Sequence, residues 1–438
     1  MSPFGVLADD LTGACDTGVA FSARGARVLV LVAAEAPLPA QAAGATAWDV
    51  VVLNTDSRHL SPTEAVRQVE AGRQRLATAG WPVRYKKIDS TLRGPLAAEA
   101  GPLLAAGAAL LVCPAFPPAG RTVEDGVLRV RGTPVHETEI GRDRHNPVPE
   151  SHLPTLLGAL GRVGQVGAVD LELGRPGVAL RLGELRRRGA RVVVGDAATE
   201  AHLDTLAAAL LAAWEAPVAP LVAVGSAGLA HALAGRLLPQ AREPTLPPDF
   251  PRAGPVLVVA GSRTGVTHAQ VELLLGEPDV FGLSLEPTAV DAPDWDAQAE
   301  AWVAAQVAAL ARAAADGAGT LVVSLAPDAP GSDEPARFAR RSGRLNAALG
   351  ALVAALASRS PLAGLVLTGG DIARATLRAL EGEALQLGPE VLPGLPLGWP
   401  VGGLQPGLPL VTKAGGFGEP KALRDAAHFL RHGAPRSC

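Results

Sequence analysis

Two adjacent acidic residues follow the first apolar segment of the chain. This segment ends at Ala8, and Asp9 and Asp10 come directly after it. Carboxylates at the carboxyl end of a parallel strand lie where α/β proteins bind ligands, and such a group can serve as a general base. The alternative is that one of them only caps the helix expected from about Cys15. The residue types leave both interpretations open and do not say which aspartate would be the base.

Two further polar groups, NTDSRHL (54–60) and KKIDSTLRG (86–94), follow short apolar segments in the first half of the chain. Arg can bind a carboxylate through two parallel N–H donors, Lys offers a point charge, and the hydroxyls can bind sugar oxygens. The alternative is a solvated turn in which Asp89 or Ser90 caps a helix. Three polar groups at strand ends within one half favour a site for a small, anionic, hydroxylated ligand. The candidate substrate-binding residues are Asp56, Arg58, Lys87, Asp89, Ser90 and Arg93.

In the second half, three apolar segments are followed by glycine-rich segments, at residues 261–265, 368–371 and 413–418. Glycine lets the backbone approach a phosphate, and the amino terminus of a following helix attracts negative charge. No GxxxxGK[ST] and no strand–GxGxxG–helix unit is present, which argues against a P-loop nucleoside triphosphatase and against a nicotinamide dehydrogenase. Together these segments predict a cradle for nucleotide phosphates. The candidate residues there are Ser262, Gly369, Gly370, Asp371, Ile372 and Gly415.

The elements that would position these residues are short apolar strands that alternate with Ala- and Leu-rich helical stretches. Strands that are apolar on both faces and alternate with helices indicate parallel sheets in α/β layers. Residues 117–150 are polar and show little helical periodicity, so a long irregular stretch is expected there, which is either functional or a simple surface excursion. The expected strands are 28–32, 51–54, 109–116, 191–196, 221–226, 256–262, 320–326, 364–371 and 408–416, with a further short strand before Lys86.

Six prolines between residues 237 and 255 mark the clearest boundary in the chain. Proline fixes φ and lacks a backbone donor, so this stretch is expected to hold neither a helix nor a central strand. The sequence therefore predicts an α/β protein of two domains, each with a mainly parallel sheet flanked by helices, with the active site in the interdomain cleft. The predicted parts are a domain over 1–236 with the site for the small anionic ligand, a linker over 237–255 and a domain over 256–438 with the cradle for nucleotide phosphates.

Composition narrows the classes of function. The chain of 438 residues has 39 Lys and Arg against 43 Asp and Glu, a formal net charge of -4, which argues against broad binding to nucleic acid. Cys15, Cys113 and Cys438 are widely spaced, so neither a disulfide framework nor a zinc site is expected, and a reducing cytoplasm fits. No signal peptide or membrane-spanning segment is expected.

In this order, the polar and glycine-rich segments resemble the four-carbon acid sugar kinase family over nearly the whole chain. The family usually has Asn where this chain has Cys15, which concerns the choice of substrate rather than the class of reaction. The segments that carry the resemblance are ADDLTGACDT (8–17), NTDSR (54–58), KKIDSTLRG (86–94), PAFPPAGRTVEDG (114–126), GSAGLA (225–230), AGSRTGVTHAQ (260–270), LTGGDIA (367–373) and TKAGGFGEPKAL (412–423).

The resemblance implies an N-terminal domain that binds the acid sugar, a C-terminal domain that binds the nucleotide, and ATP-dependent phosphorylation of threonate, erythronate or an oxo-tetronate. Under this hypothesis Arg93 and Lys87 hold the substrate carboxylate, and the other candidates of the first half bind its hydroxyls. Mg²⁺ would neutralise charge during transfer, and Asp9 or Asp10 would be the base. No metal ligand is assigned.

The expected partners are the acid sugar and ATP, with neither nucleic acid nor a membrane, and self-association into a homo-oligomer stays open. Two rival classes of function remain. One is another enzyme that processes sugar acids, such as an oxidoreductase or an aldolase. The other is a non-catalytic sensor of sugar acids or nucleotides.

Overall fold

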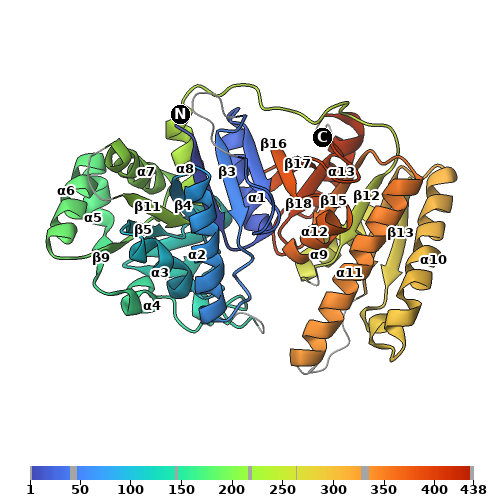
Figure 1. Ribbon diagram of the computed structural model, residues 1–438, viewed down its shortest axis with the longest axis horizontal. Helices are drawn as coiled ribbons and strands as arrows, with labels where there is room; N and C mark the ends of the chain where they lie inside the picture. Colours follow the sequence, from blue (N-terminus) through green and yellow to red (C-terminus); the bar gives the residue numbers. More distant parts are fainter. Residues whose placement is uncertain are drawn as a thin grey trace. The chain divides into compact units, whose positions relative to one another are not determined.

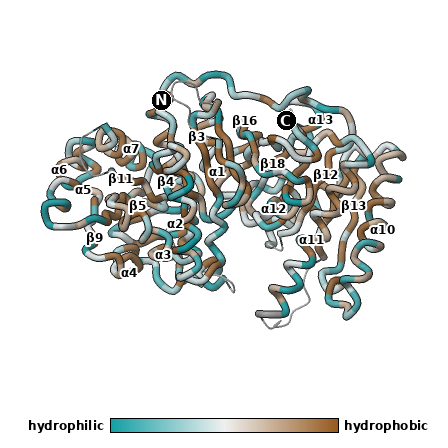
Figure 2. Tube along the Cα trace, viewed as in Figure 1, coloured by the Kyte–Doolittle hydropathy of each residue, from teal (hydrophilic) through white to brown (hydrophobic). Residues whose placement is uncertain are grey.

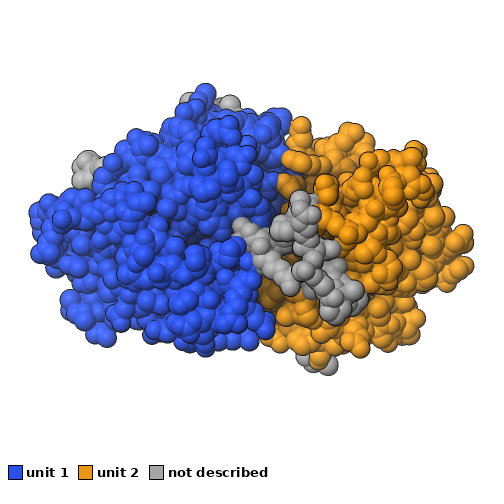
Figure 3. Space-filling view, turned by 90° about the horizontal axis from the view of Figure 1, so that it is seen from below, with its two compact units in different colours: residues 1–244 blue, residues 245–438 orange. Residues whose placement is uncertain are grey.

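The computed structural model describes residues 2–39, 47–143, 147–215, 220–262, 264–326 and 335–434, so Cys438 lies outside the described residues (Figure 1). The chain divides into two compact units, Met1–Pro244 (unit 1) and Thr245–Cys438 (unit 2), which Figure 3 colours separately. Neither a helix nor a strand lies between Leu237 and Val256, in agreement with the proline-rich composition of that stretch.

The strands of the main sheet of unit 1 run parallel, in the spatial order β2-β3-β1-β4-β11-β5-β10-β9. Helix α1 packs against α8, α8 against α7 and α7 against α6, while α2 packs against α3. The bounds are β1 Phe4–Ala8, α1 Leu11–Ser22, β2 Val28–Leu31, β3 Val50–Asn54, α2 Pro62–Thr78, β4 Val83–Lys87, α3 Leu96–Ala105, β5 Ala109–Cys113, α4 Leu153–Leu156, β9 Val163–Val166, α5 Ala168–Glu172, α6 Gly174–Arg187, β10 Val192–Gly195, α7 Glu200–Glu215, β11 Leu221–Gly225 and α8 Ala227–Leu237.

The register of unit 1 brings the polar segments together. Ala8, the last residue of β1, pairs with Asn54 of β3 on one side and with Lys87 of β4 on the other. Lys87 in turn pairs with Gly225 at the end of β11. Strands β1, β3 and β11 are buried along their whole length. They are mostly apolar, as the brown traces of β3 and β11 show in Figure 2, whereas β4 carries Arg84, Lys86 and Lys87. The segments that follow β1, β3 and β4 therefore leave the same edge of the sheet.

The predicted irregular excursion contains a small antiparallel sheet of β6 (Arg121–Glu124), β7 (Val127–Val130) and β8 (Thr133–Pro134). The expectation of an irregular segment was wrong there, because strands of two to four residues with polar side chains leave too short a pattern to recognise. We call Arg121–Pro134 the hairpin segment. Val123 and Ala197 exchange two backbone hydrogen bonds of 3.0 and 2.9 Å, which tie this segment to the residues after β10.

In unit 2 the strand order is β13-β14-β12-β15-β18-β17-β16. The first five strands are parallel, whereas β17 runs antiparallel to both β18 and β16. The bounds are β12 Val256–Ala260, α9 Gly265–Leu275, β13 Val280–Leu285, α10 Trp295–Ala315, β14 Thr320–Leu325, α11 Pro335–Arg359, β15 Gly364–Thr368, α12 Gly370–Ala379, β16 Ala384–Leu392, β17 Leu395–Pro400, β18 Leu410–Lys413 and α13 Ala422–His432.

The glycine-rich segments of unit 2 also leave one edge of its strands. Ala260 pairs with Thr368, and Thr368 pairs with Lys413, so β12, β15 and β18 end at the same level. The two expected strands 364–371 and 408–416 are too long, because their glycines lie beyond Thr368 and Lys413. No helix within the described residues is long and apolar enough to cross a membrane.

Candidate active site

The two adjacent aspartates after β1 have different structural roles. Asp10 is the N-cap of α1, and its Oδ1 accepts a hydrogen bond of 2.9 Å from the backbone N–H of Gly13. The helix therefore begins at Leu11, four residues before the expected start at Cys15. A Cβ on Gly13 would lie 2.4 Å from Lys87 Nζ, so this turn requires glycine. The capping alternative is correct for Asp10, and Asp9 is left for another role.

Arg58 holds both aspartates through three hydrogen bonds. Its Nε donates to Asp9 Oδ2 at 2.7 Å, while Nη1 and Nη2 donate to the two carboxylate oxygens of Asp10 at 2.8 and 2.6 Å. Burial opposes the charge of Arg58, but Asp10 and Asp9 raise its pKa well above the usual value. Both oxygens of Asp10 are thus engaged, because Oδ2 also accepts from the Thr12 hydroxyl at 2.6 Å.

Asp9 keeps one carboxylate oxygen open. Its Oδ1 is buried and has no hydrogen-bond partner among the described residues, and Lys87 Nζ lies 3.6 Å from it. Burial alone would raise the pKa of Asp9, but the charges of Arg58, Lys87 and Lys86 lower it to about 2. Asp9 is therefore a carboxylate at neutral pH, with a free acceptor oxygen that faces a lysine.

Lys86 belongs to a separate buried pair beneath this edge. Its Nζ donates to Glu99 Oε2 of α3 at 3.0 Å, and the other oxygen of Glu99 accepts from the Ser57 hydroxyl. Ser57 also shares a hydrogen bond of 2.8 Å with Thr55, whose hydroxyl donates to the carbonyl of Ala8. This network joins the segments after β1, β3 and β4, and it fixes the backbone on which Asp9 and Arg58 sit.

Asp89 and Arg93 form the second ion pair of the edge. Arg93 donates from Nε and Nη2 to the two oxygens of Asp89 at 2.8 and 3.0 Å, and its Nη1 lies 3.8 Å from Asp143. Burial opposes ionisation of Asp89, but Arg93 and Arg58 hold its pKa well below the usual value. The N-cap of α3 is Pro95, so neither Asp89 nor Ser90 caps that helix. The capping alternative was wrong for this segment.

The structure thus brings the predicted substrate-binding residues to one edge of the unit 1 sheet, in two paired groups. Asp9, Asp10, Arg58 and Lys87 make up the first group, and Asp89 with Arg93 the second, with Arg58 Nη2 3.9 Å from Asp89 Oδ1 as the link. Asp56, in a left-handed conformation with φ of 51°, and Ser90 lie partly exposed in the adjoining turns. Because Nε and Nη2 of Arg93 already donate to Asp89, these two donors are not free to bind a substrate carboxylate in this structure.

In unit 2 the segment after β18 is shaped by one buried lysine. Lys413 Nζ donates to the carbonyls of Ala414, Gly415 and Phe417 at 2.9, 3.1 and 2.9 Å. An ammonium group has three donors, so all of them are used on the backbone. Burial lowers the pKa of Lys413 to about 8. In the sequence this lysine stands at the start of a glycine-rich segment, and no role was predicted for it.

The N-cap residue of α9 and two residues of that helix also bind carbonyls of this segment, Ala414–Glu419, which we call the β18 loop. The hydroxyls of Thr264 and Thr267 donate to the carbonyl of Gly415 at 2.9 and 2.8 Å. Gln270 Nε2 donates to the carbonyls of Phe417, Gly418 and Glu419 at 3.2, 3.1 and 2.9 Å. With its carbonyls turned toward buried donors, the loop can present backbone N–H groups to an anion, as a nest does.

The remaining predicted nucleotide residues surround this loop. A Cβ on Gly415 would lie 2.1 Å from Ser262 Oγ, so the two segments touch. Gly369 is the N-cap of α12, with Gly370 and the exposed Asp371 in its first turn. Ile372 is only 3% exposed, and its side chain lies where a Cβ on Gly261 would be, so it packs beneath the loops instead of at their surface.

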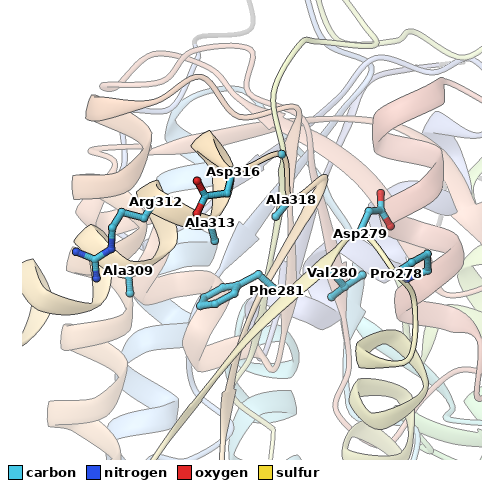
Figure 4. Close-up of a pocket in the computed structure, with 10 residues that line it drawn as sticks. Pro278, Asp279, Val280, Phe281, Ala309, Arg312, Ala313, Asp316 and Ala318 are labelled. Carbon is cyan, nitrogen blue, oxygen red and sulfur yellow. The ribbon is translucent and has the colours of Figure 1, made fainter.

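A hollow of unit 2 lies at the opposite end of its parallel strands. A cavity of about 540 Å³ is bordered by Pro278–Phe281 at the start of β13 and by Arg312, Ala313 and Asp316 at the end of α10 (Figure 4). Val280 pairs with Thr320 and Thr320 with Val256, so this is the amino end of the parallel strands, opposite to the glycine-rich edge. It is therefore distinct from the predicted nucleotide site.

Metal and thiol chemistry have limited support in the described part of the chain. No cluster of three or more His, Cys, Asp or Glu residues there could hold a metal ion. Cys15 and Cys113 are buried and form no disulfide, and burial raises the pKa of the Cys113 thiol to about 12. A nucleophilic cysteine needs a lowered thiol pKa, so Cys113 is not suited to that role.

Two family models cover most of the chain. Residues 4–233 match a sugar-binding N-terminal domain, and residues 257–423 match a nucleotide-binding C-terminal domain. Among similar proteins, the D-threonate kinase of Bordetella bronchiseptica is 39% identical over 98% of this chain and 97% of its own length. That of Salmonella typhimurium is 34% identical over 97% of both chains. The D-erythronate kinase of Heliobacterium modesticaldum is 30% identical over 98% of this chain and 97% of its own.

Solved structures agree with these matches. A crystal structure from Salmonella typhimurium LT2 superposes with a TM-score of 0.77 at 25% identity, covering 96% of this chain and 98% of its own. One from Haemophilus influenzae has a TM-score of 0.70 at 23% identity, covering 98% and 100%, and supports the fold alone. Matches to both domain models and to kinases over nearly the full length place the chain in one family: it belongs to the four-carbon acid sugar kinases.

Proposed function

We propose that this chain transfers the γ-phosphoryl group of ATP to a hydroxyl of D-threonate. The acid is chosen because three relatives at 34–39% identity are named D-threonate kinases, whereas the relative named D-erythronate kinase is 30% identical. Those named 3-oxo-tetronate kinase are 28–32% identical. The geometry that carries the proposal is the open oxygen of Asp9.

Asp9 is assigned as the residue that receives the proton of the substrate hydroxyl. The hydroxyl donates to Asp9 Oδ1, a buried acceptor with no partner of its own among the described residues. As the hydroxyl oxygen bonds to the γ-phosphorus, the bond from that phosphorus to the bridging oxygen breaks, ADP leaves, and the proton passes to Asp9. Because the transition state is loose, orientation matters more than strong basicity, and a pKa of about 2 suits an orienting carboxylate.

Asp10 and Arg58 position Asp9 without taking the proton. Arg58 holds Oδ2 of Asp9 at 2.7 Å, which turns Oδ1 away from the guanidinium. Asp10 fixes the two Nη groups of Arg58 and the start of α1 at once. Lys87, 3.6 Å from Oδ1, places a positive charge beside the point at which the hydroxyl reacts.

On unit 2, the β18 loop and the amino terminus of α12 would hold the nucleotide phosphates. The supporting observation is that every carbonyl gathered by Lys413, Thr264 and Gln270 is turned inward. Asp371, exposed in the first turn of α12, fits Mg²⁺, which in kinases is bound by one or two carboxylates together with the phosphates. When bound, the ion would neutralise charge on those phosphates.

The test is ADP release from the purified full chain with a panel of four-carbon acids. D-threonate is expected to give the highest kcat/KM, followed by D-erythronate and 3-oxo-tetronate. Threitol, which lacks the carboxylate, serves as the matched control. Turnover highest with another acid of the panel would overturn the choice of D-threonate, and ATP hydrolysis that is independent of every acid would overturn the proposed kinase activity.

A further inference from the structure

Arg121 differs from the basic residues of the candidate active site in having no acidic ion-pair partner among the described residues. Arg58 is paired with Asp9 and Asp10, and Arg93 with Asp89. Lys86 is paired with Glu99, and Lys87 lies near Asp9. Each of these charges is therefore compensated within the protein, whereas that of Arg121 is not compensated by any ion pair of the described chain.

The backbone places Arg121 firmly at the first position of the hairpin segment. After β5, a short 3₁₀ turn, Pro117–Ala119, reverses the chain. Phe116 and Arg121 then exchange two backbone hydrogen bonds of 2.8 and 3.1 Å. Cys113 at the end of β5 pairs with Gly225, which in turn pairs with Lys87 at the end of β4. The segment that carries Arg121 therefore leaves the same edge of the sheet as the candidate active site.

Only some of the hydrogen-bond donors of the Arg121 guanidinium have an acceptor among the described residues. Nη1 donates to the carbonyl of Ala119, whereas Nε is buried and has no hydrogen-bond partner among the described residues. Burial without a paired acid lowers the pKa of Arg121, in contrast to Arg58 and Arg93, whose pKa values are raised. Buried donors are normally satisfied, so a donor left open beside a substrate site indicates an acceptor that arrives with the ligand.

The carboxylate of Asp196 holds the hairpin segment in place through hydrogen bonds to its backbone. Its carboxylate accepts from the backbone N–H groups of Asp125 and Gly126, both at 3.0 Å, and from Gln165 Nε2 at 3.2 Å. Asp196 is 4% exposed and follows β10 directly. With the bridge between Val123 and Ala197, these contacts fix the carboxyl end of β6, and the bridge between Phe116 and Arg121 fixes its start. Arg121 is therefore presented on a braced strand and not on a free loop.

We propose that Arg121 binds the carboxylate of the acid sugar, through Nε and an Nη group, and so selects acids over neutral polyols. This inference rests on the proposed function. A planar guanidinium with adjacent open donors matches a carboxylate in two parallel hydrogen bonds. Arg93 then acts as a positioning residue that holds Asp89, because its own fork is already taken by that carboxylate.

The experiment compares Arg121→Gln with Arg129→Gln, a basic residue of the same hairpin segment whose Nη1 donates only to the carbonyl of Gly132 among the partners described. Arg121→Gln is expected to raise the KM for D-threonate by about 10- to 100-fold, the usual value of a charge-assisted pair. The KM for ATP should not change. Arg129→Gln should leave both constants within about twofold, because exposed surface positions contribute little.

The uncharged amide of D-threonate separates binding of the carboxylate from general damage to the site. The wild-type protein should discriminate the acid from the amide, and Arg121→Gln should lose most of this discrimination. Arg121→Lys keeps the charge but not the fork, so it should fold even if the glutamine variant does not, and it should give an intermediate KM.

The outcomes distinguish this inference from the proposed function. If the wild-type protein turns over no four-carbon acid, both are overturned. If it does, and Arg121→Gln and Arg121→Lys keep the wild-type preference for the acid over the amide, only the role of Arg121 is overturned. The same conclusion holds if Arg93→Ala alone abolishes that preference.

Discussion

The candidate sites of the two units differ in the groups that would bind an anionic ligand. At the candidate edge of unit 1, charged side chains face one another in pairs, with Arg58 between Asp9 and Asp10. At the corresponding edge of unit 2, the backbone itself is shaped, and Lys413, Thr264, Thr267 and Gln270 hold the carbonyls of the β18 loop. One site uses side-chain charge, and the other uses the direction of peptide groups.

This difference determines how each site should respond to substitution. Removing one charge in unit 1 leaves its buried partner unpaired, so the effect falls on chemistry and on stability together. Changing one residue in unit 2 alters the path of the loop, so the effect should fall on nucleotide affinity while the acid site stays intact. The predictions that follow test this contrast, beginning with the largest effect.

Asp9→Asn should nearly abolish turnover. The variant loses the oxygen that receives the hydroxyl proton, and loss of a general base costs about 10²- to 10⁴-fold in rate. Asparagine retains an oxygen that can accept from Arg58 Nε, so the fold and the affinity for ADP should be retained. The measurement is kcat by ADP release, with calorimetric titration of ADP and a thermal melt on the same preparation.

Asp10→Asn is the matched control, since it neutralises the neighbouring carboxylate. Asp10 caps α1 and holds two Nη groups of Arg58, so this variant should lower the melting temperature more than Asp9→Asn does. Loss of such a cap costs about 0.5–2 kcal/mol. If Asp10→Asn proves the slower enzyme while Asp9→Asn keeps wild-type kcat, the assignment of the base must be reversed.

Gly415→Val should weaken nucleotide binding by about tenfold, equivalent to ~1.4 kcal/mol. The added Cβ would meet Ser262 Oγ at 2.1 Å, so the β18 loop has to move away from the segment after β12. Calorimetry with ADP measures the effect, and the KM for D-threonate should stay within about twofold, since this position lies in the other unit.

Gly416→Ala is the control within the same loop. No atom lies within 4 Å of a Cβ at Gly416, and the residue is exposed. This variant should therefore bind ADP as the wild-type protein does. Equal ADP affinities for Gly415→Val and the wild-type protein would show that the β18 loop does not contact the nucleotide. The view that unit 2 binds its ligand through the backbone of this loop would then be wrong.

The same contrast explains what could be predicted from the sequence. Side chains that act by charge are visible as residue types, so Asp9, Asp10, Arg58, Asp89 and Arg93 could be chosen from their places after apolar segments. Their pairing could not, because it depends on side-chain directions across three strands. The sequence thus suggested Arg93 for the carboxylate, whereas the structure shows its fork bound to Asp89.

A backbone site leaves a weaker signal. The glycines of unit 2 were recognisable, but the residues that shape the loop are an ordinary lysine, two threonines and a glutamine, three of them on α9 or just before it. Ile372 was grouped with the nucleotide contacts because it follows Gly370 and Asp371, and the structure buries it beneath Gly261. The hairpin segment was missed because its strands are short and polar.

The smallest expected effect concerns pH and the lysine beneath the β18 loop. Burial lowers the pKa of Lys413 from its usual 10.5 to about 8, so the ammonium loses its proton within an accessible range. A neutral amine has one donor fewer for the three carbonyls and no charge to offer bound phosphates. The KM for ATP should therefore rise by about two- to tenfold as pH increases through 8, the value of roughly one hydrogen bond.

Stability should change in the opposite direction. Between pH 8 and 10.5 the unfolded chain keeps a proton on this lysine that the folded chain has released, and the free energy of unfolding rises with pH wherever the unfolded state binds more protons. Other groups titrate in the same range, so the quantity to measure is the difference between the wild-type protein and Lys413→Met in both the KM for ATP and the free energy of unfolding. Lys421→Met, at an exposed lysine just beyond the loop, should follow the wild-type protein in both. If the KM for ATP rises with pH in Lys413→Met as steeply as in the wild-type protein, Lys413 does not govern the loop, and the β18 loop would have to owe its shape to Thr264, Thr267 and Gln270 alone.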